Sequence, residues 1–343
     1  MNYGISPISG GAFPIQLGIH NKIKGYLCDT NIDLGTSGGN VCNYIGLITD
    51  YRLNSMERVL KDLNCKMFCQ PWTDYSKINI AIGYFSNSLY KSGTGAKKFF
   101  RKYIDREILE RKELWTGVYN ISRKKSCFYS NYTYDRSKVN YNLFNPDIYI
   151  SDRLSYLNFN LDNISEVSLA SASIPGYVPP VYFEGEYLVD GGVFYSSPLS
   201  VFPDLIIDTH NKYGQTNMVY VSSYDMQKNC KPVIHQNLVE NFRYVTYEML
   251  RSLNNQDRNT GINIVKTISS NHTIHNLEIP DCTENTLSHI GNIQRKCKCS
   301  FIEFYPRKEL ELDISKFCHV DTMSVIDSIR LHGMGCRMFW CES

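Results

Sequence analysis

Asn31-Ile32-Asp33-Leu34-Gly35-Thr36-Ser37-Gly38-Gly39-Asn40 is the stretch that decides the fold of this chain. It contains the pattern G-x-S-x-G, in which Gly35 and Gly39 flank Ser37. In that pattern a strand turns sharply into a helix, and the serine stands at the apex of the turn. Glycines suit both sides because the turn is strained and the two elements must approach closely. The stretch therefore predicts a serine at the apex of a strand-to-helix turn.

The residues around this turn fit the prediction. Residues 32–34 can end a strand, and Val41, Ile45 and Ile48 then recur at helical spacing. The Ser37 hydroxyl would stand at a helix N-terminus, where backbone N–H groups favour negative charge. A glycine- and serine-rich loop that only turns the chain is the alternative interpretation.

A second stretch runs from Ser168 to Val193. Small residues at 168–173 predict a tightly packed helix, and the segment Ile174-Pro175-Gly176-Tyr177-Val178-Pro179-Pro180 ends it. A hairpin then leads to Asp190-Gly191-Gly192. Together with the Ser37 turn, these residues resemble the patatin-like phospholipase family. That family pairs a G-T-S-x-G serine with a D-G-[AG] aspartate, and an A-S-x-x-[IF]-P-x-x-[FV]-P-P segment precedes the aspartate.

A third motif, Gly4-Ile5-Ser6-Pro7-Ile8-Ser9-Gly10-Gly11, resembles the family's first strand and its glycine-rich oxyanion loop. The resemblance implies that backbone N–H groups of Gly10, Gly11 and Ala12 hold a negative oxygen. The family continues with another glycine and a basic residue, whereas Ala12-Phe13-Pro14 follow here. Pro14 has no N–H to donate. An ordinary strand-to-helix turn is the alternative.

The resemblance covers about the first two-thirds of the chain, and it implies a fold, a reaction and a substrate class. The fold is α/β, with three layers and a mainly parallel central sheet flanked by helices. Ser37 is the nucleophile and Asp190 is the general base. Gly35, Gly39, Gly191 and Gly192 support the two motifs. The substrate is a phospholipid or another acyl lipid, and the reaction requires no metal and no cofactor.

Two other functions remain open. In a Ser-Asp-His α/β-hydrolase the acid and the base follow the serine along the chain. Ser37 and Asp190 would then act with a histidine, for which the candidates are His210, His235, His272, His275 and His289. The altered oxyanion loop alternatively indicates a catalytically degenerate relative that serves as a binding or virion-associated protein.

Composition limits the function classes. The chain has 343 residues, of which 43% are hydrophobic and 20% are charged, and its formal net charge is +2. This composition builds a folded core, and the small charge argues against nucleic-acid binding. The N-terminus shows no classical signal peptide, and no apolar run reaches the length of a membrane span. We therefore expect a cytoplasmic protein that contacts membranes peripherally. The sequence does not predict the oligomeric state.

Cysteine spacing gives no strong metal motif. Cys65 and Cys69 lack evident further ligands, and Cys297, Cys299, Cys336 and Cys341 match no zinc pattern even with His289 or His319. In a chain without an export signal, twelve cysteines are interpreted as free thiols.

Strand and helix patterns alternate along the chain, which favours one α/β domain over 1–343. The recognisable motifs occupy 1–225, and an α/β extension follows over 226–343. The patterns predict strands over 4–9, 78–85, 218–223, 262–268 and 301–305, with the 218–223 strand as the last of the core sheet. They predict helices over 15–23, 52–64, 97–114, 238–255 and 320–333, with Thr94 capping the third.

Overall fold

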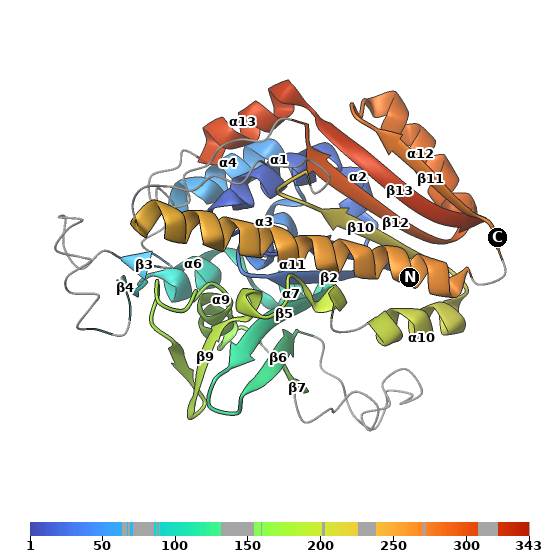
Figure 1. The fold of residues 1–343 in the computed structure, drawn as a ribbon. Helices are drawn as coiled ribbons and strands as arrows, with labels where there is room; N and C mark the ends of the chain where they lie inside the picture. Colours follow the sequence, from blue (N-terminus) through green and yellow to red (C-terminus); the bar gives the residue numbers. More distant parts are fainter. Residues whose placement is uncertain are drawn as a thin grey trace.

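The computed structural model describes residues 1–63, 67, 69–70, 86, 88, 90–131, 154–158, 160–200, 203–225, 238–269, 272–307 and 322–342. A large central sheet lies between two layers of helices (Figure 1). This confirms the predicted α/β class with a mainly parallel sheet.

The order of strands in the sheet is β11-β13-β12-β10-β1-β2-β5-β6-β7. From β12 to β5 every neighbouring pair is parallel, whereas β13 and β6 run antiparallel at the two flanks. The strands are β1 (Asn2–Ser6), β2 (Ile32–Thr36), β5 (Glu113–Asn120), β6 (Lys125–Ser130), β7 (Leu154–Asn158), β8 (Val181–Phe183), β9 (Glu186–Asp190), β10 (Thr216–Val221), β11 (Ile274–Ile279), β12 (Cys297–Pro306) and β13 (Met334–Glu342). The short strands β3 (Cys69–Gln70) and β4 (Lys91–Ser92) form a separate pair.

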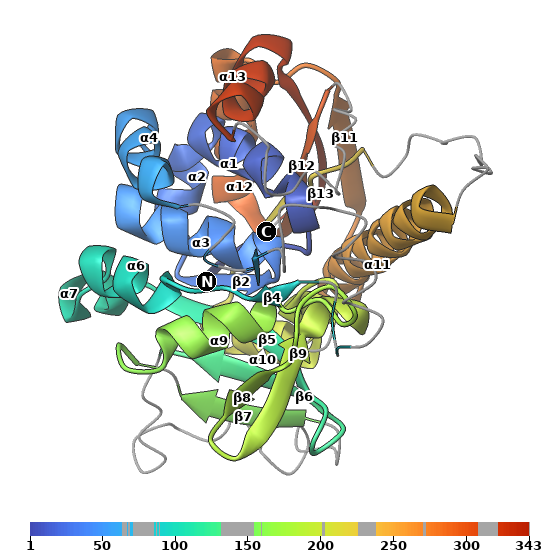
Figure 2. The same ribbon diagram turned by 90° about the vertical axis from the view of Figure 1, so that its left-hand side faces the viewer.

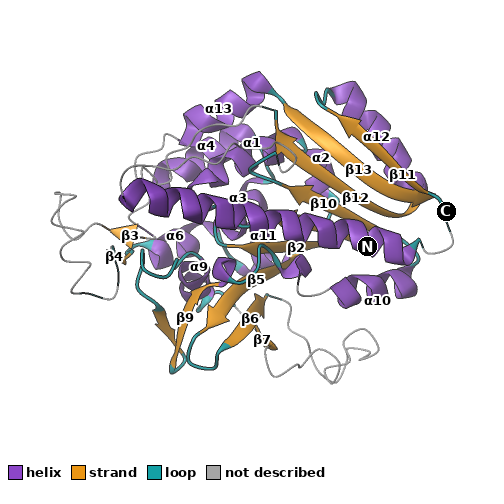
Figure 3. Ribbon diagram, viewed as in Figure 1, coloured by secondary structure: helices purple, strands orange, loops and turns teal. Residues whose placement is uncertain are grey.

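Helices cover both faces of this sheet (Figure 3). They are α1 (Phe13–Lys22), α2 (Lys24–Cys28), α3 (Gly38–Thr49), α4 (Leu53–Asp62), α6 (Ala96–Tyr103), α7 (Arg106–Glu110), α9 (Ile164–Ser171), α10 (Pro203–Tyr213), α11 (Leu238–Ile268), α12 (Glu284–Lys296) and α13 (Thr322–His332). Short 3-10 turns span η1 (Gly10–Ala12), η3 (Gly191–Val193) and η4 (Pro198–Ser200). Within the ranges that the structure describes, no helix is both long and apolar enough to cross a membrane.

Strand β10 packs against the helix layers on both faces of the sheet. All of its residues are buried. Val219 and Val221 pack into the apolar cluster formed with α1, α3 and α13, whereas Met218 and Tyr220 pack into the cluster formed with α10 and α11. Alternate residues of a strand point to opposite faces, so a central parallel strand needs apolar residues throughout.

Several element predictions are wrong in informative ways. The predicted 97–114 helix is two helices, because Ile104 is extended and the Asp105 side chain accepts the Ile108 N–H at 2.8 Å, which starts α7. Gly95, not Thr94, is the N-cap of α6, and β5 already begins at Glu113. The 218–223 strand is not the last of the core sheet, because β12 continues it in parallel.

The predicted 262–268 strand is the final part of the long helix α11. Its β-branched residues favoured a strand by propensity. Ile262 and Val265 instead form one helical face that packs on the sheet, and Gly261 lies directly over the ring of Phe301. The predicted 301–305 strand is confirmed within β12, whereas the predicted 78–85 strand lies outside the described residues.

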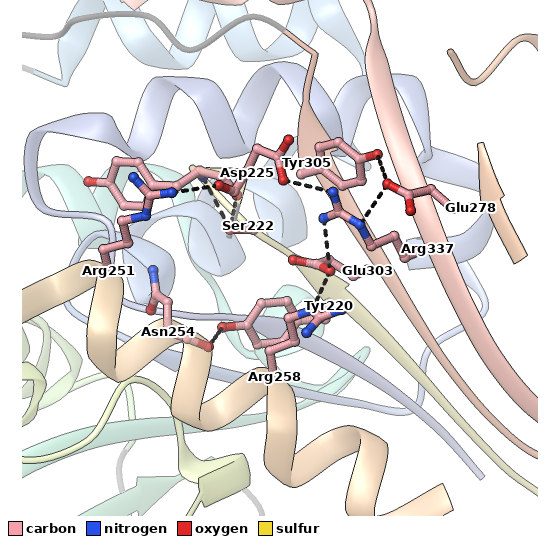
Figure 4. Close-up of polar contacts among 11 residues, drawn as sticks. Tyr220, Ser222, Asp225, Arg251, Asn254, Arg258, Glu278, Glu303, Tyr305 and Arg337 are labelled. Atoms are coloured by element: carbon pink, nitrogen blue, oxygen red, sulfur yellow. Dashed lines mark hydrogen bonds and ion pairs between the residues drawn. The ribbon is translucent and has the colours of Figure 1, made fainter. Parts of the chain in front are cut away.

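Buried charges join α11 to the sheet beyond the predicted motifs (Figure 4). The Arg258 guanidinium lies 2.7 Å from the Glu303 carboxylate, and both side chains are almost fully buried. Arg337 extends the network to Asp225 at 2.8 Å and to Glu278 at 3.0 Å. Its guanidinium also lies 4.0 Å from the centre of the Tyr305 ring. These contacts hold α11 against the face of the sheet that β10 and β12 contribute.

Replacing Arg258 with alanine should destabilise the protein strongly, because it removes the nearest partner of the buried Glu303 carboxylate. The expected loss in the free energy of unfolding is about 3–5 kcal/mol, measured by urea denaturation. The control is Arg307→Ala, whose partner Asp281 lies at a similar 2.8 Å but in an exposed pair. That variant should lose less than about 1 kcal/mol. Equal losses would contradict the role of the buried network.

Candidate active site

The turn between β2 and α3 holds Ser37 in an unusual backbone conformation. Its φ is 57° and its ψ is −129°, and α3 begins at the next residue. A positive φ is uncommon outside glycine, and such strain persists only where the surroundings impose it. The turn brings Ser37 to the end of β2 with its side chain at the N-terminus of a helix. Only 5% of the residue is exposed.

Gly39 allows the close contact that holds this turn. A Cβ atom at Gly39 would lie 2.0 Å from the Ser6 carbonyl oxygen and 2.4 Å from that of Pro7. No side chain fits at these distances, so α3 rests directly on the backbone that follows β1. The first turn of α3 is therefore held beside the glycine-rich loop.

Strand β5 brings Ser37 and Asp190 together. Thr36 at the end of β2 lies opposite Gly117, and Asp190 at the end of β9 lies opposite Val118. Strand β6 occupies the other edge of β5 along this segment. Hence β2 and β9 share one edge of β5, run in opposite directions, and end facing each other. Residues far apart in the sequence meet at this point because of sheet pairing alone.

The Asp190 carboxyl group is a hydrogen-bond partner of the Ser37 side chain and also accepts the Gly192 N–H at 2.7 Å. Only 2% of Asp190 is exposed. Burial raises the pKa of Asp190 from its ordinary value of 3.8 to about 7, although the hydrogen bonds from Ser37 and Gly192 oppose the rise. A carboxylate with this pKa accepts a proton far more readily near neutral pH than an ordinary aspartate does.

The raised pKa has a consequence for stability. The unfolded chain ionises Asp190 near its ordinary pKa of 3.8, whereas the folded chain retains the proton until about pH 7. The fold therefore loses stability as pH rises through this window. Asp190→Asn should remove that loss, so the variant should exceed the wild type in unfolding free energy at pH 8. The difference should shrink toward pH 4, as measured by urea denaturation across pH. A constant difference would contradict the shifted pKa.

The glycine-rich loop lies beside Ser37. Gly10 has a φ of +50°, and the 3-10 turn η1 begins there. A Cβ atom on Gly38, the residue after Ser37, would lie 2.8 Å from the Gly10 carbonyl oxygen. The Ala12 N–H donates to the Ser9 carbonyl oxygen at 2.9 Å. The first N–H groups of a helical turn have no acceptor within the turn. The N–H groups of Gly10 and Gly11 are therefore the candidates for binding a negative oxygen.

Ser171, at the end of α9, is a positioning residue whose role the sequence did not reveal. Its hydroxyl accepts the Ser37 N–H at 3.0 Å and donates to the Gly117 carbonyl oxygen at 2.8 Å. It therefore ties the strained turn to β5. The small-residue helix predicted close packing here, but packing alone did not indicate which serine makes these bonds.

Asn254 on α11 is a second residue that the motifs missed. It is fully buried. Its side-chain amide donates to the Ile8 carbonyl oxygen at 3.1 Å, and its side-chain oxygen accepts the Ser196 hydroxyl. The Ile8 N–H also donates to the Ser196 carbonyl oxygen at 2.9 Å. Asn254 thus joins the loop before Gly10 to the segment after Asp190, and Figure 4 shows it on the same helix as Arg251 and Arg258.

Replacing Asn254 with alanine should slow the reaction of Ser37 with an organofluorophosphonate. The change leaves the Ile8 carbonyl and the Ser196 hydroxyl without this partner, so the two loops lose their common support. A lost buried partner is worth about 1–3 kcal/mol, which corresponds to about a tenfold slower labelling. The matched control is Asn255→Ala, an exposed neighbour on the same helix that should react like the wild type. Equal rates for both variants would refute the positioning role.

The described histidine candidates lie elsewhere. His275 is on β11, five strand positions from β2 in the sheet order, a separation of about 24 Å at the usual strand spacing. The His272 ring contacts Lys298, and His289 is exposed on α12. His210 lies close enough to the Met1 amino group to be affected by its charge. Met1 precedes the amino end of β1, whereas Ser37 follows the carboxyl end of β2. His235 lies outside the described residues.

Eight cysteines of the described ranges are free thiols, namely Cys28, Cys42, Cys127, Cys282, Cys297, Cys299, Cys336 and Cys341. Among those ranges, no three residues of the His, Cys, Asp and Glu types come together in an arrangement that could hold a metal ion. Cys65 and His319 of the candidate metal sets fall outside the described part of the chain.

Comparison with known families supports the motif assignment. A family model described as patatin-like phospholipase matches residues 12–203, more than half of the chain. The match includes Ser37 and Asp190 and begins after Gly10 and Gly11. No curated protein sequence matches the chain.

Among solved structures, VipD from Legionella pneumophila is similar at 11% identity and a TM-score of 0.34. The similarity covers 95% of this chain and 66% of VipD, so the chain spans just under two thirds of that length. A likeness at this level gives no information about activity.

Proposed function

The chain belongs to the patatin-like phospholipase family, and on that premise we propose that it is a serine esterase that cleaves fatty-acyl esters of phospholipids or other acyl lipids. Membership of the family indicates lipid acyl hydrolysis as the general activity. The observation that carries the proposal is the pairing of Ser37, in a strained turn, with a buried Asp190 whose pKa is raised to about 7.

In the proposed mechanism Asp190 takes the proton of the Ser37 hydroxyl as its oxygen attacks the ester carbonyl carbon. A serine hydroxyl is a weak nucleophile until a base removes this proton. The tetrahedral intermediate carries a negative oxygen, for which we propose the N–H groups of Gly10, Gly11 and Gly38 as donors. The Ala12 N–H is excluded from this set because it is bonded to Ser9.

Collapse of the intermediate breaks the ester bond and leaves the acyl group on Ser37. The protonated Asp190 gives its proton to the departing alcohol. Asp190 then takes a proton from water as the water oxygen attacks the carbonyl carbon of the acyl-enzyme. It returns this proton to Ser37 Oγ as the bond between Ser37 and the acyl group breaks, and the fatty acid leaves. The chain's own residues supply every proton transfer in this sequence, so it draws on no metal or cofactor chemistry.

A second candidate is a binding protein that has lost catalysis. The feature that favours it is the glycine-rich loop, where Ala12 and Phe13-Pro14 replace the family's usual glycine and basic residue. In that case a lipid would occupy the site without being cleaved.

Fatty-acid release from mixed phospholipid vesicles tests the proposal. Ser37→Ala should lower the rate at least about a thousandfold, because the nucleophile is lost. Asp190→Asn should lower it at least about a hundredfold, the contribution typical of a general base. Ser252→Ala, an exposed serine on α11, is the control and should keep full activity.

The pattern of results separates the candidates. Lipid binding without release by the wild type would support the binding protein and contradict the esterase. Loss of activity on replacing a histidine, with Asp190→Asn still active, would support the Ser-Asp-His alternative.

A further inference from the structure

The β5–β6 turn and the β8–β9 hairpin form a ribbon of large apolar side chains on the protein surface. Tyr182 is 63% exposed, Tyr187 is 51%, Phe194 is 55% and Ile121 is 42%. Figures 1 and 2 both show the turn and the hairpin next to each other at the lower edge of the molecule. The Ile121 N–H donates to the Tyr187 carbonyl oxygen at 3.0 Å, which joins the two segments. We call these residues, with Tyr119, the aromatic ribbon.

Sheet pairing places the tyrosines of this ribbon on one face. Tyr119 lies opposite Val189, and Tyr182 lies opposite Tyr187, two residues before Val189 in β9. Paired and alternate residues share a face. The rings of Tyr182 and Tyr187 have centroids 5.0 Å apart, and Phe194 stacks on Tyr119 at 3.9 Å.

The opposite face of the same ribbon is buried against the core. Val118, Leu188 and Asp190 point to that side and are almost fully covered. A surface strand pair with one buried face normally presents polar residues to water on the other. Here the exposed part of the outer face, at Tyr182 and Tyr187, is aromatic, whereas Val189 on the same face is covered. The exposed part therefore lacks the composition expected of a surface that remains in water.

Three consecutive cationic residues lie at the β5–β6 turn of the aromatic ribbon. Arg123, Lys124 and Lys125 follow Ile121 after one intervening serine, and Arg123 and Lys124 are exposed. Arg123 pairs with Glu186, and the hairpin adds Glu184. The segment therefore retains an excess of positive charge after its carboxylates are counted. Tyrosine rings suit the headgroup zone of a bilayer, where an apolar ring and a polar hydroxyl are both accommodated, and nearby lysines attract anionic lipids.

We propose that the aromatic ribbon docks this protein on a bilayer that contains anionic lipids. The inference rests on the proposed lipid substrate. It adds the surface through which the enzyme reaches that substrate. Tyr187 precedes the base Asp190 by three residues in β9, a distance of about 10 Å along the strand. Because this separation is an odd number of residues, the two side chains point to opposite faces of β9, so the ribbon would hold the enzyme at the bilayer without itself lining the dyad.

Sedimentation with vesicles tests the docking surface. The probes are vesicles of phosphatidylcholine alone and of phosphatidylcholine with phosphatidylserine. Tyr182→Ser with Tyr187→Ser should weaken partitioning to both kinds of vesicle at least about tenfold. Burying even one large apolar side chain changes a partition constant by at least about this factor. The matched control is Tyr213→Ser on α10, because that tyrosine is also 51% exposed and should leave binding unchanged.

Charge is tested separately. Lys124→Glu with Lys125→Glu should weaken binding to the anionic vesicles at least about fivefold, an effect that added salt reduces. Binding to phosphatidylcholine alone should change little. These variants and the tyrosine variants should hydrolyse a soluble short-chain ester at the wild-type rate, because neither pair touches Ser37 or Asp190.

Three results would overturn the docking surface. One is unchanged vesicle binding by the double tyrosine variant. Another is an equal loss with Tyr213→Ser. The third is a change in oligomeric state by light scattering with vesicle binding intact, which would assign the ribbon to contacts between copies. Vesicle binding through the ribbon without fatty-acid release would instead refute the proposed hydrolysis and leave docking standing.

Discussion

The constraint on which the site depends is that β2 and β9 end facing each other on one edge of β5. This pairing brings Thr36 opposite Gly117 and Asp190 opposite Val118. A serine that follows one strand and a carboxylate that ends the other then meet without any long side chain reaching across a gap. The strained turn at Ser37 and the burial of Asp190 both follow from this arrangement, because the backbone on every side is fixed by the sheet.

The C-terminal part of the chain supports the candidate active site that the N-terminal motifs form. Helix α11 packs on the face of the sheet at β10 and β12 and is held by buried charge pairs among Arg258, Glu303 and Arg337. The same helix supplies Asn254, which bonds to the loops on both sides of the serine. This region lies beyond the segment that the family model matches. Its charges are costly to bury and are stable only as a connected set, so they hold α11 in one position.

Sequence patterns predicted the α/β class and the elements that carry the motifs, because these depend on local signals. G-x-S-x-G needs glycine on both sides of a tight turn, and the apolar run over 218–221 in β10 is continuous because helices cover both faces of the sheet. The contacts of Ser171 and Asn254 were not predictable, since each depends on tertiary pairing that no spacing encodes. Helix α11 was predicted to stop early because the β-branched residues after Gly261 favour a strand locally, while packing on Phe301 decides for a helix. The sequence patterns also did not predict the aromatic ribbon, because alternation in a strand does not show which face is exposed to water.

The most direct test of the account is the pH dependence of Ser37 labelling by an organofluorophosphonate, repeated with an organic cosolvent. The account predicts that the rate rises with pH through an apparent pKa near 7, as Asp190 loses its proton. A lower dielectric disfavours charged groups, so the cosolvent should raise this pKa if a carboxyl group controls the rate. A pKa that falls with cosolvent would identify an imidazolium as the controlling group, and a rate set by a pKa near 4 would show that Asp190 is an ordinary aspartate. Either result would contradict the Ser37–Asp190 dyad as described.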